Sequence, residues 1–149
     1  MTNLCFQTKA YWNFLLKSKT KYRIHSPFVY KLVTQCLENP RGFKKLSATN
    51  QMFQLKNYLL KSNSRESEVI EGLILESMDD FQVINDFIQN SSEGSFLLIK
   101  KPHENQTKEK LWKRLKTSHQ LNVSIDLFFV GILFKRPQQV EEHFRIRLL

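Results

Sequence analysis

The spacing of apolar residues changes once along the chain, near Val69, and this change limits the folds that are open to it. Before Val69, apolar side chains recur every three or four residues, as they do on one face of a helix. The series begins with Phe6, Ala10, Tyr11, Phe14 and Leu15. After Val69, apolar residues form short runs typical of buried parallel strands. The pattern predicts an α/β protein in which N-terminal helices precede a small sheet.

Three helices are predicted in the first part of the chain. The second has the clearest start, because Ser26 can cap the free amides and Pro27 fits the first helical position, where its missing N–H costs nothing. Asn39 and Pro40 are expected to end that helix. The third helix is expected over residues 47–61, with its apolar residues on one side.

A first strand–helix unit begins with the apolar run from Val69 to Leu75. In the helix that follows, Asp79 or Asp80 is expected to be the N-cap, and Gly94 is expected to lie just past the end as a turn residue. The predicted inner face of this helix consists of Phe81, Val83, Ile84, Phe87 and Ile88.

A second strand–helix unit is predicted from a strand at Ser95–Ile99 and a helix at Lys108–Leu115. Two further strands, Val123–Phe129 and Gly131–Lys135, have almost no loop between them, so we expect them to form an antiparallel pair. Asp126 lies within the first of these two strands and is expected to point to solvent at an edge. Together these elements predict a mixed sheet of about four strands covered by helices.

Charge is distributed along the chain in three blocks. Residues 1–65 contain 12 Lys or Arg and the single acid Glu38, residues 66–99 contain 8 acids and no base, and residues 100–149 contain 11 bases and 5 acids. Clustered Lys and Arg gain affinity for phosphates by releasing counterions, so the basic segment 1–65 predicts an anionic partner. The same blocks also fit an acidic element docked against basic ones.

Size and composition favour a single domain over residues 1–149, made of the basic helical segment and a partial sheet in residues 66–149. A chain of this length that is 41% hydrophobic can bury one core. Its apolar runs stay short of the roughly 20 residues that cross a bilayer, and its N-terminus lacks a signal-peptide pattern. We therefore expect a cytoplasmic protein with no membrane partner. Cys5 and Cys36 lack metal-ligand spacing and are expected to be buried, reduced thiols, with no bound metal.

Both ends of the chain resemble small class I S-adenosylmethionine (SAM) dependent methyltransferases of a type common in Bacteroidetes. The matching stretches are His-Ser-Pro-Phe-Val at residues 25–29, the hairpin at 124–136 and the Glu-His-Phe-Arg-Ile-Arg tail at 142–147. The strand at 95–99, His103 and Trp112 fall where this family has its fifth strand, a loop histidine and a helix tryptophan. The resemblance implies a fold like the second half of a Rossmann-like methyltransferase.

The departures from the family pattern concern the cofactor. Such enzymes hold SAM at a glycine-rich turn after their first strand, where the backbone approaches the cofactor closely. This chain has 4 glycines and no Gly-x-Gly. Only about ten polar residues separate its N-terminal helices from what resembles the fourth strand, so the first three strands have no counterpart. The leading expectation is therefore a non-catalytic remnant that acts, if at all, as a binding or scaffold protein, with no assigned catalytic, cofactor or metal residue.

Four residues are candidates for a ligand crevice at the carboxyl ends of the strands, where α/β sheets bind ligands. They are Glu76, Lys100, Lys101 and His103. His103 beside the two lysines is suited to a phosphate or carboxylate, although a solvated loop also fits. Relatives carry acids at the position of the lysines, and in some of them those acids help to hold a divalent metal. Two cations reverse the electrostatics and argue against a metal there.

Two other functions remain open. One is an active SAM-dependent methyltransferase whose pocket is completed by oligomerisation, and the other is a basic nucleic-acid-binding module that uses residues 1–65. Without the first three strands of the family, Leu73–Leu75 would form an exposed edge, which tends to find a partner or be covered. We expect either a homodimer through this edge or N-terminal helices folded over it.

Overall fold

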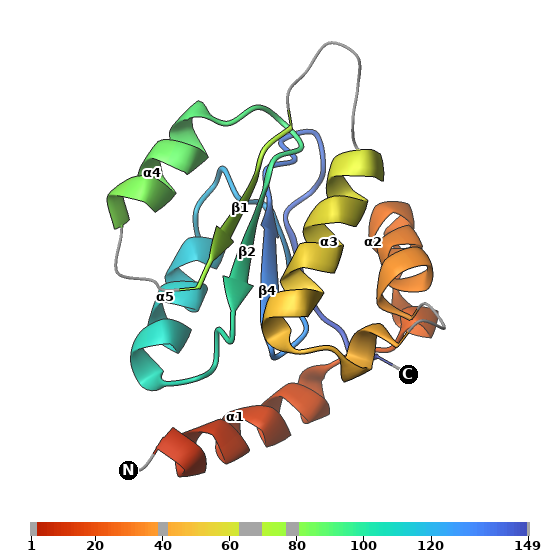
Figure 1. Ribbon diagram of the computed structural model, residues 1–149, viewed down its shortest axis with the longest axis vertical. Helices are drawn as coiled ribbons and strands as arrows, with labels where there is room; N and C mark the ends of the chain where they lie inside the picture. Colours follow the sequence, from red (N-terminus) through yellow and green to blue (C-terminus); the bar gives the residue numbers. More distant parts are fainter. Residues whose placement is uncertain (1–2, 39–41, 63–69, 77–80, 149) are drawn as a thin grey trace.

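A mixed sheet of five strands lies between two layers of helices (Figure 1). The computed structural model describes residues 3–38, 42–62, 70–76 and 81–148. The strand order is β1-β2-β4-β3-β5. The strands are β1 (Gly72–Leu75), β2 (Phe96–Lys100), β3 (Val123–Asp126), β4 (Val130–Phe134) and β5 (Glu142–Arg145). The predicted α/β class, with helices first and a mixed sheet after them, is confirmed.

The helices begin and end close to the predicted positions. They are α1 (Asn3–Lys17), α2 (Pro27–Leu32), α3 (Ala48–Ser62), α4 (Phe81–Asn90) and α5 (Gln106–Lys116), with a π-helical turn, η2 (Val33–Leu37), continuing α2. The Ser26 side chain accepts a hydrogen bond from the Val29 amide at 3.4 Å, as the Ser-Pro start predicts. The expected stop at Asn39 and Pro40 and the expected caps Asp79 and Asp80 lie outside the described residues.

Alternation along the central strands divides the core between the two faces of the sheet. Phe96 and Leu98 of β2 belong to the cluster under α2, η2 and α3, whereas Leu97 and Ile99 belong to the cluster under α4 and α5. Every one of these four side chains is fully buried. Because successive side chains of a strand point to opposite faces, a strand buried on both sides reads as a continuous apolar run.

The pairing of the strands agrees with the predicted directions and adds one strand. β1 pairs with β2 in parallel, and β4 runs antiparallel between β2 and β3. The predicted antiparallel hairpin is therefore present, but β3 ends at Asp126 instead of Phe129. A fifth strand, β5, pairs in parallel with β3. The buried side chain of Asn122 holds the segment that leads to β5. The side-chain amide of Asn122 donates to the carbonyls of Arg136 and Gln139 in this segment.

The predicted inner face of α4 is wrong in part. Phe81 is 51% exposed and Val83 is 41% exposed, whereas Ile84 and Ile88 are buried. Phe87 is half-buried and packs against the same cluster, so the contact of α4 with the sheet is a narrow stripe on one side of the helix. Lys135, at the end of β4, donates to the carbonyls of Ile88 and Ser91 and so caps the C-terminus of α4.

The two outer edges of the sheet differ in what pairs with them. The outer edge of β1 has no strand partner among the described residues, and α3 packs on one face of β1 without pairing with that edge (Figure 1). The N-terminal segment instead pairs at the opposite edge, where Lys19 forms a parallel bridge with Ile146. Within the described part of the chain, no helix is both long enough and apolar enough to cross a bilayer.

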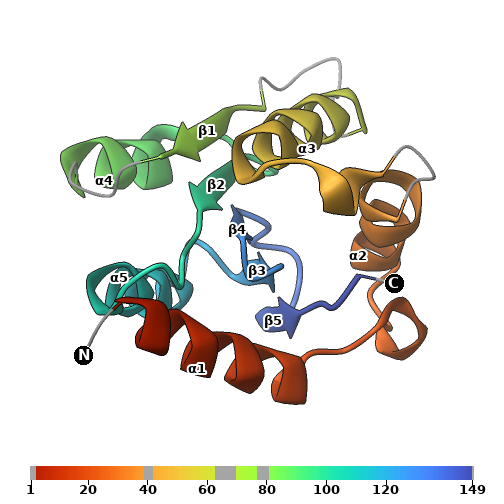
Figure 2. The same ribbon diagram turned by 60° about the horizontal axis from the view of Figure 1, so that its bottom comes forward.

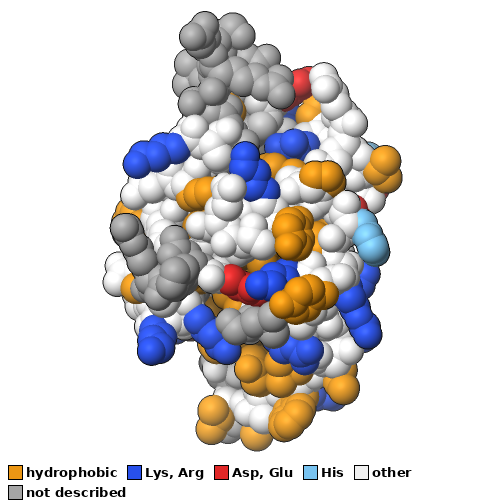
Figure 3. Space-filling view, turned by 90° about the vertical axis from the view of Figure 1, so that its right-hand side faces the viewer, with side chains coloured by type: hydrophobic (Ala, Val, Ile, Leu, Met, Phe, Trp, Pro, Cys, Tyr) orange, Lys and Arg blue, Asp and Glu red, His pale blue; other side chains and the backbone are white. Residues whose placement is uncertain are grey.

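Basic side chains are spread over the face that α2 and α3 present to solvent. Figure 3 shows Lys and Arg distributed across this face with hydrophobic side chains between them and few acids. Glu38, the acid of the N-terminal block, forms an ion pair with Lys21 at 3.0 Å. The face formed by these helices is therefore predominantly basic.

Candidate functional site

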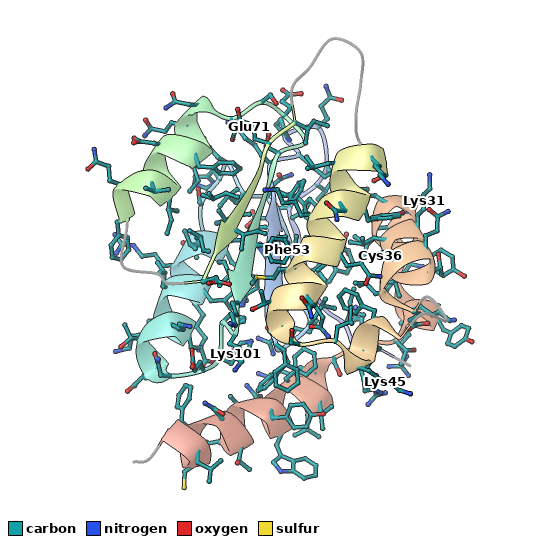
Figure 4. All side chains as sticks on the ribbon, in the orientation of Figure 1. Lys31, Cys36, Lys45, Phe53, Glu71 and Lys101 are labelled. Carbon is teal, nitrogen blue, oxygen red and sulfur yellow. The ribbon has the colours of Figure 1, made fainter. Side chains whose placement is uncertain are left out.

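The carboxyl ends of β1, β2 and β3 lie at the same end of the sheet, because these three strands run in the same direction. This end is called the carboxyl edge below, as distinct from the outer edges formed by β1 and β5. Glu76 follows β1, Lys100 ends β2, and Lys101 and His103 lie in the loop after β2. Figure 4 shows Lys101 at this edge, on the side that faces α1. Glu76 and Lys101 are exposed, and among the described residues no hydrogen bond or ion pair joins Glu76 to the other three candidates. Of the four candidates, His103 is the one whose side chain lies in a cluster of contacting side chains among the described residues.

The closest partner of His103 is Asp126, at the carboxyl end of β3. The Nε2 atom of His103 lies 2.6 Å from Oδ2 of Asp126. Because an ionised carboxylate only accepts hydrogen bonds, Nε2 is assigned as the donor. The other carboxylate oxygen accepts the amide of Phe128 at 2.8 Å. The expectation that Asp126 points to solvent is wrong: its side chain is 3% exposed, because β5 covers β3 on its outer side and His103 covers the carboxylate.

The remaining surfaces of the imidazole are also covered. The ring of Phe128 stacks on that of His103, with centroids 5.3 Å apart and planes at 16°. Phe128 itself has a φ of 72°, in the left-handed region, which turns the chain sharply from β3 towards β4. Nδ1 of His103 is buried without a hydrogen-bond partner and lies 3.7 Å from Oε1 of Glu109. Both ring nitrogens therefore face carboxylates of the protein itself.

Helix α1 lies across this edge of the sheet (Figure 2). The amide of Gln7 donates to the carbonyl of Glu104 at 3.0 Å. The rings of Tyr11 and Phe14 pack against Phe128, with centroids 4.9 and 5.6 Å apart. The part of this space that adjoins Phe128 is thus occupied by side chains of the N-terminal helix.

A cavity of about 540 Å³ separates the remainder of α1 from α5. Its walls are formed by Phe6, Lys9, Ala10, Asn13, Gln106, Glu109, Lys110 and Lys113. Glu109 forms an ion pair with Lys113 at 3.5 Å and stands between this cavity and His103. The cavity is lined by basic, acidic and apolar side chains. Glu109 both lines this cavity and contacts His103 of the buried cluster.

The loop after β2 is held by its own acid–base pair. Lys108 donates to Glu104 at 2.5 Å, and this hydrogen bond holds the pKa of the Glu104 carboxyl below its ordinary value. The Asn105 side chain caps α5 by accepting from the amide of Lys108 at 2.9 Å. The predicted start of this helix, Lys108, lies two residues after its observed start at Gln106.

These groups suit a structural role better than a chemical one. Nucleophilic catalysis needs a hydroxyl, thiol or amine beside a base that can reach the substrate, and here both imidazole nitrogens are buried against carboxylates. Among the described residues, no group of three or more His, Cys, Asp or Glu could hold a metal ion. The cluster fastens the loop after β2 to the turn between β3 and β4.

Close packing against buried rings requires glycine at two positions. A Cβ atom on Gly72 would lie 2.5 Å from the ring of Phe96, and one on Gly131 would lie 2.5 Å from the ring of Trp112. Both rings are fully buried. Gly42 and Gly94 have positive φ and serve turns. Each of the four glycines in the chain therefore has a local structural role.

Sequence reasoning missed Asp126 and Glu109 as neighbours of His103. An acid inside an apolar strand was the available signal for Asp126, since a buried carboxylate needs a partner. Glu109 gave no such signal, because its spacing from Lys113 equally fits an exposed helical pair. Comparison of the chain with protein-family models, curated proteins and solved structures gives no match.

Proposed function

We propose that the chain is a non-catalytic relative of the class I SAM-dependent methyltransferases and acts as a binding or scaffold protein. The arrangement of its sheet supports this relationship: two strand–helix units place β1 and β2 in parallel, and an antiparallel hairpin follows. This is the order of elements that the sequence resemblance implies for the second half of such an enzyme. Both cysteines are free thiols; Cys36 is buried as expected, whereas Cys5 is exposed, so its expected burial is wrong. Free thiols fit a reducing compartment and a cytoplasmic location.

The observation that carries the non-catalytic assignment is the position of α1. In open α/β sheets, ligands bind in the crevice beyond the carboxyl ends of the strands. Here Tyr11 and Phe14 of α1 pack on Phe128 at this edge, and Gln7 hydrogen-bonds the adjoining loop. A ligand entering beside His103 would have to displace these side chains and lose the burial that they gain.

The glycines provide independent support. A cofactor that lies against the backbone requires glycine at the point of approach. Gly72 and Gly131 are instead in contact with Phe96 and Trp112, inside the core. This packing role of two of the four glycines fits the lack of a Gly-x-Gly in the sequence.

Calorimetric titration with SAM and with its demethylated product tests the proposal. We expect no saturable heat at about 1 mM ligand, a concentration that detects binding as weak as about −4 kcal/mol. A matched variant, Tyr11→Ala with Phe14→Ala, opens the edge beneath α1 and should also fail to bind. Saturable binding by the unaltered protein would overturn the proposal. Binding by the opened variant alone would identify α1 as a cover over a working site and would overturn it too.

The partner that we propose for the scaffold role is a second copy of the chain, joined through β1. Leu73 and Ile74 are half-buried on the edge strand, whose outer side has no strand partner among the described residues. Unpaired strand edges with apolar side chains tend to pair with another chain. Light scattering after size-exclusion chromatography should give the mass of a dimer, and Ile74→Lys should give a monomer. A monomer at every concentration would reject this partner.

A further inference from the structure

A small basic cavity lies where the C-terminal ends of α1 and α5 meet β5. Its volume is about 270 Å³, and four Lys or Arg side chains line it together with His143. Lys17 ends α1 and Lys19 follows it, Lys116 ends α5, and Arg145 ends β5. Figure 2 shows α1 passing beside both α5 and β5, which brings these three chain segments together.

Backbone pairing fixes the positions of two of these side chains. The amide of Lys19 donates to the carbonyl of Arg145 at 2.8 Å, and the amide of Arg147 donates to the carbonyl of Lys19 at 2.9 Å. The parallel register places His143 beside Ser124 and Arg145 beside Asp126, on the face of the sheet that α5 covers. Ser124 hydrogen-bonds Nδ1 of His143 at 2.8 Å and orients this imidazole at the cavity wall.

Positive charge exceeds negative charge at the cavity, although Glu141 pairs with His143 at 3.1 Å and Asp126 is the register partner of Arg145. Among the described residues, no carboxylate lies within ion-pair distance of Lys17, Lys19, Lys116 or Arg145, and Glu142 is the one acid in the cavity wall. Lys116 is partly buried, and its ammonium lies over the ring of Trp112 at 5.6 Å. Burial lowers the pKa of Lys116, and the positive charge of Arg145 lowers this pKa further, whereas the carboxylates of Asp126 and Glu109 raise it in part. The repulsion between Lys116 and Arg145 is thus only partly offset by the nearby carboxylates.

We infer that this cavity binds a phosphate group. A doubly charged anion removes the repulsion between the cations, and its several acceptor oxygens match the fork of an arginine beside lysine ammonium groups. A singly charged carboxylate leaves most of the positive charge uncompensated. The volume suits one or two phosphate groups, either of a small phosphorylated molecule or of a nucleic-acid backbone that passes over the opening. This inference uses none of the residues that support the proposed function and is independent of it.

Titration with inorganic pyrophosphate and with a short single-stranded RNA tests the site and separates the two sources. We expect saturable binding of at least one probe, with an affinity that falls as salt is raised. Arg145→Gln and Lys116→Gln should each weaken it about tenfold or more, since each removes a charge-assisted hydrogen bond. Arg114→Gln is the matched control, because Arg114 is an exposed residue of α5 outside the cavity wall. It should change affinity by less than about twofold.

The pattern of binding decides each alternative. Pyrophosphate binding that Arg145→Gln and Lys116→Gln weaken assigns a small phosphorylated ligand. RNA binding that the same variants weaken, without pyrophosphate binding, assigns a nucleic-acid phosphate. If neither probe binds saturably, or if Arg114→Gln weakens binding as much as Arg145→Gln does, the inference is wrong. Lys19→Gln, at an exposed side chain that can be replaced without disturbing the core, keeps the test decisive if either of the other variants fails to fold.

Discussion

His103 and Asp126 join two loops that are distant in sequence through a buried hydrogen bond of 2.6 Å. The loop after β2 and the turn after β3 meet at the carboxyl edge of the sheet, and this bond fastens them together. Phe128 reinforces the connection by stacking on the imidazole and by donating its amide to the same carboxylate. Since α1 packs on Phe128, this one pair also supports the platform on which the N-terminal helix lies.

Removing the carboxylate of Asp126 should destabilise the protein strongly. Asp126→Ala leaves the buried imidazole and the amide of Phe128 without their acceptor, which should lower the free energy of unfolding by about 3 kcal/mol. Asp126→Asn keeps one acceptor and should cost less. Urea denaturation measures both, with Asp86→Asn on the exposed side of α4 as the control. Equal stability of Asp126→Ala and the unaltered protein would contradict the assigned role of this pair.

The attachment of α1 should depend on Phe14 and not on Trp12. Phe14 is buried against Phe128, so Phe14→Ala should cost about 3 kcal/mol of unfolding free energy. Trp12 is 62% exposed on the same helix, and Trp12→Ala should change stability by no more than about 0.5 kcal/mol. Hydrogen exchange should also accelerate at the Glu104 amide in Phe14→Ala alone. Similar losses in both variants would show that α1 does not dock through this face.

Gly131 should tolerate no larger residue. The Cβ atom of alanine would lie 2.5 Å from the ring of Trp112, which is fully buried. Gly131→Ala should therefore cost about 2 kcal/mol through overpacking. Combining it with Trp112→Phe should cost less than the sum of the two single changes, because the smaller ring relieves the clash. Additive losses in thermal or urea unfolding would argue against this contact.

Cys36 should make stability fall at alkaline pH. Burial raises the pKa of its thiol from 9.0 to about 11, so its contribution is complete below pH 9 and is lost as pH rises towards 11. The loss should reach about 2 kcal/mol and should be absent in Cys36→Ala. Labelling of the native protein by a thiol reagent at neutral pH should be confined to the exposed Cys5. Rapid labelling of both thiols would contradict the burial of Cys36.

The sequence predicted the features that neighbouring residues determine. The Ser26-Pro27 start of α2 is one, because a cap and its free amides lie within one turn of each other. The continuous apolar run of β2 is another, since burial on both faces leaves no polar position within the strand. The tight link between β3 and β4 likewise required their antiparallel pairing.

The tertiary structure alone decided the features that depend on which distant segments meet. β5 gave no strand signal in the sequence, because Glu142–Arg145 is a short edge strand that Asn122 and the pairing with β3 hold in place. Asp126 was predicted to be exposed, and its burial follows from His103, which lies in another loop. The cations of the basic cavity come from three separate segments. Apolar period and caps act over a few residues, whereas such contacts form only when the sheet and its covering helices are assembled.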